Sequence, residues 1–235
     1  MSSVQDSSAS RRRFLRLGGA LAAAVAASQA KALAQAVSPA SSPEVSPLED
    51  LMREHGLLSR ILLIYDEVRR RLDSGAQYPP QVVTQAAGIV RRFVEDYHEE
   101  LEGNHIFPRF EKSGRETDLV KVLRTQHEAG RRLTDLIMRS AEAGGGAPQE
   151  RRQLSEYLRL FARMYRPHKA RENTVLFPGL HSIVTAKEYD AMGDVFEDRE
   201  RALFGEGGFE KMVGAIAGLE KQLGIYHLSA FTPKV

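Results

Sequence analysis

The chain has 235 residues, a length that suits one domain with a small extension. It is 42% hydrophobic and 27% charged, as is usual for a soluble globular protein, and it contains neither Cys nor Trp. The absence of Cys excludes a disulfide framework and thiolate metal ligation, so any bound metal must be held by nitrogen and oxygen.

The first 36 residues differ in composition from the rest of the chain. A basic run from Ser10 to Arg16 precedes an Ala-rich apolar run over residues 17–27, and small residues follow up to Ala36. This order predicts an export signal rather than a membrane span, because the apolar run is too short to cross a bilayer. The arginines before Phe14 resemble a twin-arginine signal, which implies the twin-arginine export machinery as a partner and a periplasmic or otherwise exported protein. The alternatives are a disordered basic tail and an uncleaved anchor.

Removal of residues 1–36 would change the sign of the net charge. The whole chain carries +2, whereas the remainder has 28 basic and 30 acidic residues and therefore a net charge of −2. The pI of 8.9 belongs to the precursor and does not indicate nucleic-acid binding. The sequence contains no phosphate-binding loop, nucleophile triad or nucleic-acid patch, and we expect no stable membrane insertion once the signal is removed.

A Ser/Pro-rich linker over residues 37–47 precedes the first expected helix. The run Ser46-Pro47-Leu48-Glu49 combines a capping box with Pro at the first helical position, which predicts a helix start near Leu48. Apolar residues then recur every three or four positions up to residue 73, and Ser74-Gly75 ends this helix. A second helix follows Pro79-Pro80 and continues towards Phe107-Pro108.

The remaining helices follow the same amphipathic pattern. A third helix is expected from about residue 116 to the glycines at 144–146, and a fourth from Pro148 to about Leu180. Further helices are expected over residues 185–203 and 209–223. The chain is therefore predicted to be all-α, with an antiparallel up-down-up-down four-helix bundle over residues 48–180 and a C-terminal helical extension over 181–235.

One motif, His-x-x-x-Glu-x-x-x-apolar-Phe-Pro, occurs twice. The first copy begins at His98 with Glu102, and the second begins 70 residues later at His168 with Glu172. A His and a Glu four residues apart lie on one face of a helix, so both can reach one metal ion or one pair of ions. Each copy also has a His on the preceding helix, 43 or 41 residues upstream: His55 and His127.

A single His on an apolar helix face is more often a hydrogen-bonded core residue than a metal ligand. Here four His fall on the core faces of four helices, and two are followed by Glu. Burying these two carboxylates without a partner would cost several kcal/mol each. Arginine could neutralise these carboxylates, and Arg131 is one candidate, but the paired repeat favours a metal. Six ligands exceed what tetrahedral zinc uses, which favours two ions. If both Glu bridge, and an oxo or hydroxo group bridges as well, each ion keeps one open position for a small molecule.

The repeated motif and its upstream His resemble the hemerythrin-like (HHE cation-binding) domain family, over about residues 48–180. This resemblance implies an antiparallel four-helix bundle holding two non-haem iron ions, with zinc or manganese as alternative metals. Carried over by position, it implies six metal ligands: His55, His98, Glu102, His127, His168 and Glu172.

Two positions depart from the oxygen-carrying members of this family. Those members place another His one turn after the third-helix ligand, where this chain has Arg131, and their last carboxylate is a differently spaced Asp, where this chain has Glu172. One iron is therefore expected to have fewer nitrogen ligands than in the carriers. Ferritin-like oxidases are a poorer match, because they use four Glu and a Glu-x-x-His spacing.

Three functions fit the sequence. The first is a protein that binds O2 or a related small molecule for sensing, carriage or scavenging. The second is a di-iron redox enzyme acting on peroxide, O2 or nitric oxide, and the third is metal handling without redox chemistry. Whether the chain is an enzyme stays open at this point.

Several neighbouring residues are expected to lie outside the ligand set. Glu99 points about 100° round the helix from His98, which favours a solvated position. His105 is expected either near the end of its helix or in contact with a ligand side chain rather than with the metal. The three tyrosines on the core faces are expected to be core residues, one of which could hydrogen-bond a ligating group: Tyr65, Tyr97 and Tyr165.

Overall fold

The computed structural model describes residues 45–142 and 147–234. The expected export signal over residues 1–36 and all but the last residues of the expected linker over 37–47 lie outside this part of the chain, as do the glycines at 144–146. The export signal and the linker therefore remain predictions from the sequence.

Helix α2, Pro47–Ser74, begins and ends where the sequence signals predicted. The Ser46 hydroxyl accepts a hydrogen bond from the backbone N–H of Glu49 at 3.3 Å, and Pro47 occupies the first turn. Gly75 ends the helix with a φ of 76°, a left-handed conformation that is accessible at little cost only without a side chain.

The second long helical segment is continuous from residue 81 to residue 113 but changes its hydrogen-bonding pattern along the way. Its α-helical parts alternate with two π-helical parts, η1 and η2. In chain order the parts are α3 Gln81–Ile89, η1 Val90–His98, α4 Glu99–Leu101, η2 Glu102–Ile106 and α5 Phe107–Ser113.

The fourth helical segment repeats the change found in the second. After α6, Thr117–Glu142, it consists of α7 Pro148–Arg171, the π-helical η3 Glu172–Leu176 and α8 Phe177–Leu180. Both π-helical turns, η2 and η3, start at the motif Glu and end before the Phe-Pro pair. Pro108 and Pro178 have no backbone N–H, and their rings clash with the carbonyl four residues back, so the helix widens locally. The Phe-Pro pairs thus account for a wider turn directly after each Glu.

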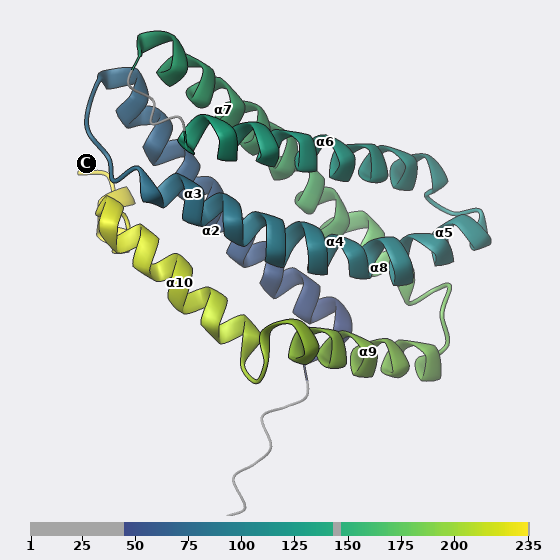
Figure 1. The fold of residues 1–235 in the computed structure, drawn as a ribbon. Coiled ribbons are helices and arrows are strands. Elements are labelled where there is room, and N and C mark those ends of the chain that lie inside the picture. Colours follow the sequence, from purple (N-terminus) through teal and green to yellow (C-terminus); the bar gives the residue numbers. More distant parts are fainter. Residues whose placement is uncertain (1–44, 143–146, 235) are drawn as a thin grey trace, which may run out of the picture. The chain divides into compact units, whose positions relative to one another are not determined.

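The four helical segments pack into a bundle in which the chain runs back and forth (Figure 1). Helix α2 packs against α7, α7 against α6, α6 against α3, and η1 closes the ring against α2. The hydrophobic core of the bundle contains large apolar side chains with less than 2% exposure, including Phe93, Phe161 and Ile61. The described residues form no strand. The predicted all-α bundle with extra C-terminal helices is confirmed.

Two C-terminal helices cover one side of this bundle. Helices α9, Ala186–Phe204, and α10, Gly208–Leu223, both pack against α2 (Figure 1), and a 3-10 turn, η4 Leu228–Phe231, follows. Glu220 of α10 accepts two hydrogen bonds from the Arg60 guanidinium of α2, at 2.9 and 2.5 Å. Phe204 packs its ring against Phe93 and Tyr97, with 5.4 Å between centroids. The extension is therefore part of the core.

In the part of the chain that the structure describes, every helix is too short or too polar to cross a membrane.

Candidate metal centre

All six side chains that the motif singled out meet in the middle of the bundle. Each of the four helical segments contributes at least one of them, and none is more than 8% exposed. The helices bring together His55 of α2, His98 of η1, Glu102 of η2, His127 of α6, His168 of α7 and Glu172 of η3.

The four imidazoles form two pairs. The Nε2 atoms of His55 and His98 are 3.0 Å apart, and those of His127 and His168 are 3.2 Å apart. The members of each pair come from consecutive helical segments. Each hairpin therefore supplies one pair, as the sequence repeat predicted.

The two carboxylates each face both imidazole pairs. Glu102 Oε1 lies 3.6 Å from His98 Nε2, and Glu102 Oε2 lies 3.4 Å from His127 Nε2. Glu172 repeats the arrangement in the opposite direction, with Oε1 at 3.2 Å from His168 Nε2 and Oε2 at 3.4 Å from His55 Nε2. Each half of the centre thus has two imidazole nitrogens and one oxygen from each carboxylate.

All four carboxylate oxygens of Glu102 and Glu172 are buried and accept no hydrogen bond from any described residue. Both side chains have 0% exposure, so no solvent shell compensates their charge. Burying an ionised carboxylate in this way is strongly unfavourable unless a cation balances it. The nitrogen and oxygen donors of each half form a donor set that divalent iron, zinc and manganese accept. The residues present therefore fit a metal centre.

A second layer of polar side chains orients three of the imidazoles. His98 donates its Nδ1–H to Glu54 Oε2 at 2.6 Å, His55 to Asn173 Oδ1 at 2.7 Å, and His168 to Gln126 Oε1 at 2.9 Å. Donation from Nδ1 leaves the Nε2 lone pair free to face the centre.

The sequence analysis did not identify these three acceptors. They share one signal that could have revealed them, because each is the immediate sequence neighbour of a motif residue: Glu54 precedes His55, Gln126 precedes His127 and Asn173 follows Glu172.

Burial shifts the protonation equilibria of the centre. It lowers the pKa of His127 to about 3, with a further contribution from His168, so this imidazole is neutral near pH 7 and its lone pair is available. Burial, followed by the negative charge of Glu172, raises the pKa of Glu102. Without a cation, one proton between the two carboxylates would relieve their repulsion, so protons and metal compete for the same oxygens.

The expectation that Glu99 is solvated is wrong. Glu99 is 4% exposed and accepts a hydrogen bond from the Tyr165 hydroxyl at 2.7 Å. Its rotation of about 100° from His98 turns it away from the centre but towards α6 and α7, which also cover this helix. Arg131 Nη2 lies 3.7 Å from Glu99 Oε2, and the same guanidinium pairs with Asp96. Arg131 therefore neutralises these two acids rather than the two motif carboxylates.

The remaining candidates lie away from the centre. The His105 ring packs against Phe196 of α9 at 5.8 Å, and burial lowers its pKa. Tyr65 and Tyr97 are buried core residues, as expected, and Tyr165 is the tyrosine that hydrogen-bonds a neighbouring acid.

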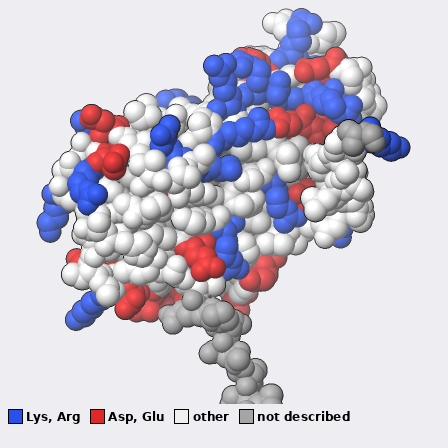
Figure 2. Space-filling model, turned by 180° about the vertical axis from the view of Figure 1, so that it is seen from behind, with Lys and Arg blue, Asp and Glu red and all other residues white. Residues whose placement is uncertain are grey.

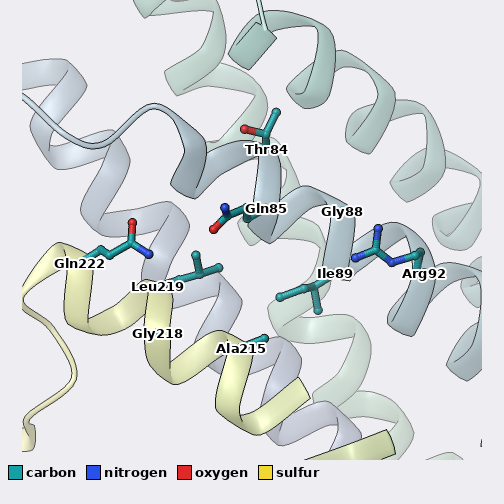
Figure 3. Close-up of a pocket in the computed structure, with 9 residues that line it drawn as sticks. All are labelled: Thr84, Gln85, Gly88, Ile89, Arg92, Ala215, Gly218, Leu219 and Gln222. Atoms are coloured by element: carbon teal, nitrogen blue, oxygen red, sulfur yellow. The ribbon is translucent and has the colours of Figure 1, made fainter. Parts of the chain in front are cut away.

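Away from the centre, the described surface carries mixed charges and a cavity whose chemistry differs from that of the centre. Lys and Arg side chains lie among Asp and Glu side chains on the face that Figure 2 shows. A cavity of about 440 Å³ lies between α3 and α10, with Ile89 and Leu219 on opposite sides (Figure 3). None of the six centre residues lines it. Its walls carry amide, hydroxyl and guanidinium groups but no carboxylate or imidazole.

Comparisons with known proteins point to the same chemistry. The hemerythrin HHE cation-binding domain model matches residues 46–180, and a second match covers 118–223, which includes the second hairpin. Uncharacterized proteins of Mycobacterium bovis and of two strains of Mycobacterium tuberculosis are each 48% identical over 186 residues, covering 79% of this chain and 73% of the relative. No solved structure matches the chain. The buried His/Glu cluster and these matches establish that the chain belongs to the hemerythrin HHE cation-binding domain family.

Proposed function

We propose that the six buried side chains hold two iron ions and that the centre binds O2 or a related small molecule. In this proposal His55 and His98 bind one ion, and His127 and His168 bind the other. Glu102 and Glu172 would each offer one carboxylate oxygen to each half of the centre. The export signal predicted over residues 1–36 would place this centre outside the cytoplasm.

The observation that carries the proposal is the arrangement of the two carboxylates. Each directs one oxygen to each imidazole pair, and all four oxygens are buried and unpartnered among the described residues. A single ion would leave one imidazole pair and two oxygens without a partner. Two ions would satisfy both halves equally, which agrees with the repeated hairpin.

Two iron ions would supply redox chemistry and, with two nitrogens and two carboxylate oxygens each, vacant positions for an exogenous ligand. The protein contributes the rest. Three of its four imidazoles are held in one tautomer by Glu54, Asn173 and Gln126, and its apolar surroundings exclude bulk water.

A second candidate function is a redox enzyme acting on peroxide, O2 or nitric oxide. Arg131 favours this enzyme function, because it stands at the position where the oxygen carriers have a further imidazole. Its guanidinium forms ion pairs with Asp96 and Glu99. Fewer nitrogen ligands would stabilise reversible O2 binding less well. Metal handling without redox chemistry is the third candidate.

Metal analysis combined with a visible spectrum tests the proposal. Protein exported by its native host is analysed for metal, then reduced and exposed to air. We expect about two irons per chain and absorption bands that respond to O2 and reverse under vacuum. Consumption of peroxide with a supplied reductant would favour the enzyme instead. Zinc, or fewer than two metals per chain, would overturn the di-iron proposal.

The hydrogen bond between Asn173 and His55 provides a separate test of the ligand set. Replacing Asn173 with Ala removes the acceptor that holds the His55 ring, and we expect metal affinity to fall about 10–100-fold. Asn104→Ala is the matched control, because Asn104 is exposed and occupies the other π-helical turn. Competition with a chelator measures both affinities. Equal affinity in the two variants would remove His55 from the set of oriented ligands.

A further inference from the structure

A second group of acidic side chains lies beside the candidate centre. Asp50 and Glu54 are one turn apart on α2, and Glu200 comes from α9. One carboxylate oxygen from each lies within 4.8 Å of the others. The group is separate from the six centre residues but touches them, because Glu54 is the acceptor for His98 Nδ1–H.

Glu54, a member of this group, has one carboxylate oxygen without a hydrogen-bond partner among the described residues. Its side chain is only 2% exposed, and while Oε2 is occupied by His98, Oε1 is buried and has no hydrogen-bond partner among the described residues. Buried polar atoms without partners point to a group that is bound there.

The surrounding positive charge only partly balances the three acids. Arg53 lies 3.4 Å from Asp50 but also reaches Glu210 and stacks over the Phe209 ring. Burial and the charges of Glu54 and Glu200 raise the pKa of Asp50 to about 7. The positive charge of Arg53, which is shared with Glu210, thus leaves the three carboxylates incompletely neutralised.

The backbone of the turn before α10 fixes the third carboxylate. Glu200 Oε1 accepts a hydrogen bond from the backbone N–H of Phe209 at 3.0 Å. Gly208 makes room for this contact, because a Cβ at that position would lie 2.7 Å from Glu200 Oε1. Glu200 also lines a surface cavity of about 110 Å³ together with Glu197 and Glu206, so ions can reach it from solvent.

We propose that Asp50, Glu54 and Glu200 bind one hard divalent cation at a site distinct from the His/Glu centre. Ligands that are all oxygen select hard cations such as Mg²⁺, Ca²⁺ or Mn²⁺. The bundle supplies two of the carboxylates and the C-terminal extension supplies the third. The extension thus completes a site that the four-helix bundle alone lacks. The proposal does not depend on which metal occupies the His/Glu centre.

Mn²⁺ titration of the metal-loaded protein tests the site, since electron paramagnetic resonance measures free Mn²⁺ directly. With the His/Glu centre already filled, we expect the wild-type chain to bind one additional Mn²⁺ saturably. Glu200→Gln and Asp50→Asn each remove one ligand charge and should weaken this binding at least about tenfold. Asp194→Asn, an exposed acid on the same helix as Glu200, is the control and should bind as the wild type does.

Metal content before and after the titration separates this site from the His/Glu centre. Glu102→Ala, which is expected to disrupt the centre, should keep the additional Mn²⁺, and Glu200→Gln should keep the metal of the centre. The proposal is overturned if the loaded wild type binds no additional Mn²⁺, if Glu200→Gln and Asp50→Asn bind it with unchanged affinity, or if the binding disappears with Glu102→Ala. The first two results leave the proposed function of the His/Glu centre untouched.

Discussion

Replacing Glu102 or Glu172 with Ala should remove at least one metal ion per chain and lower the thermal stability of the metal-loaded protein. Each carboxylate contacts both imidazole pairs, so its loss affects both halves of the centre. A ligand present at 100 times its Kd stabilises a fold by about 2.7 kcal/mol, which for a domain of this size corresponds to a Tm change of roughly 5–10 °C. Metal analysis and calorimetry measure the two effects.

In the metal-free form, replacing Glu102 is expected to have the opposite effect on stability. In that form Glu102 is a buried acid whose pKa is raised by burial and by the charge of Glu172, so replacing it relieves a desolvation cost. The metal-free Glu102→Ala variant should therefore be at least as stable as the metal-free wild type. Glu128→Ala, at an exposed acid next to His127, should change neither metal content nor stability. Full metal content in both Glu102→Ala and Glu172→Ala would contradict the bridging role.

Replacing Gly130 with Ala should destabilise the fold by about 2–3 kcal/mol, a large effect for one methyl group. A Cβ at this position of α6 would lie 2.7 Å from Tyr165 Cζ and closer still to the hydroxyl. Tyr165 is 1% exposed and cannot move without disturbing its neighbours, and its displacement would break the hydrogen bond to Glu99. Urea denaturation measures the loss in the free energy of unfolding.

The matched control for Gly130 is another helical glycine. Gly214 of α10 is exposed and has no atom within 4 Å of an added Cβ, so Gly214→Ala should stabilise the helix by about 0.5–1 kcal/mol. Opposite signs for the two substitutions would separate the close approach of Tyr165 from general helix propensity. A Gly130→Ala variant as stable as the wild type would show that Tyr165 can be accommodated elsewhere.

The sequence by itself determined the helices and the place where their His and Glu side chains meet. Capping signals located the start of α2 at Pro47 and that of α7 at Pro148, because caps and proline act within one turn of chain. The motif residues could be placed on the inner faces because a spacing of four residues fixes a common face of a helix. These are local properties, and a single sequence contains them.

Only the tertiary structure decided what surrounds each helix. Glu99 is buried because α6 and α7 cover its side of the second segment, although its sequence position relative to His98 indicated solvent. The direction in which α9 and α10 fold back is equally non-local, and it brings Glu200 within reach of Asp50 and Glu54. Burial depends on which neighbours fill the space around a side chain, and helical periodicity carries no information about neighbours more than 100 residues away in the chain.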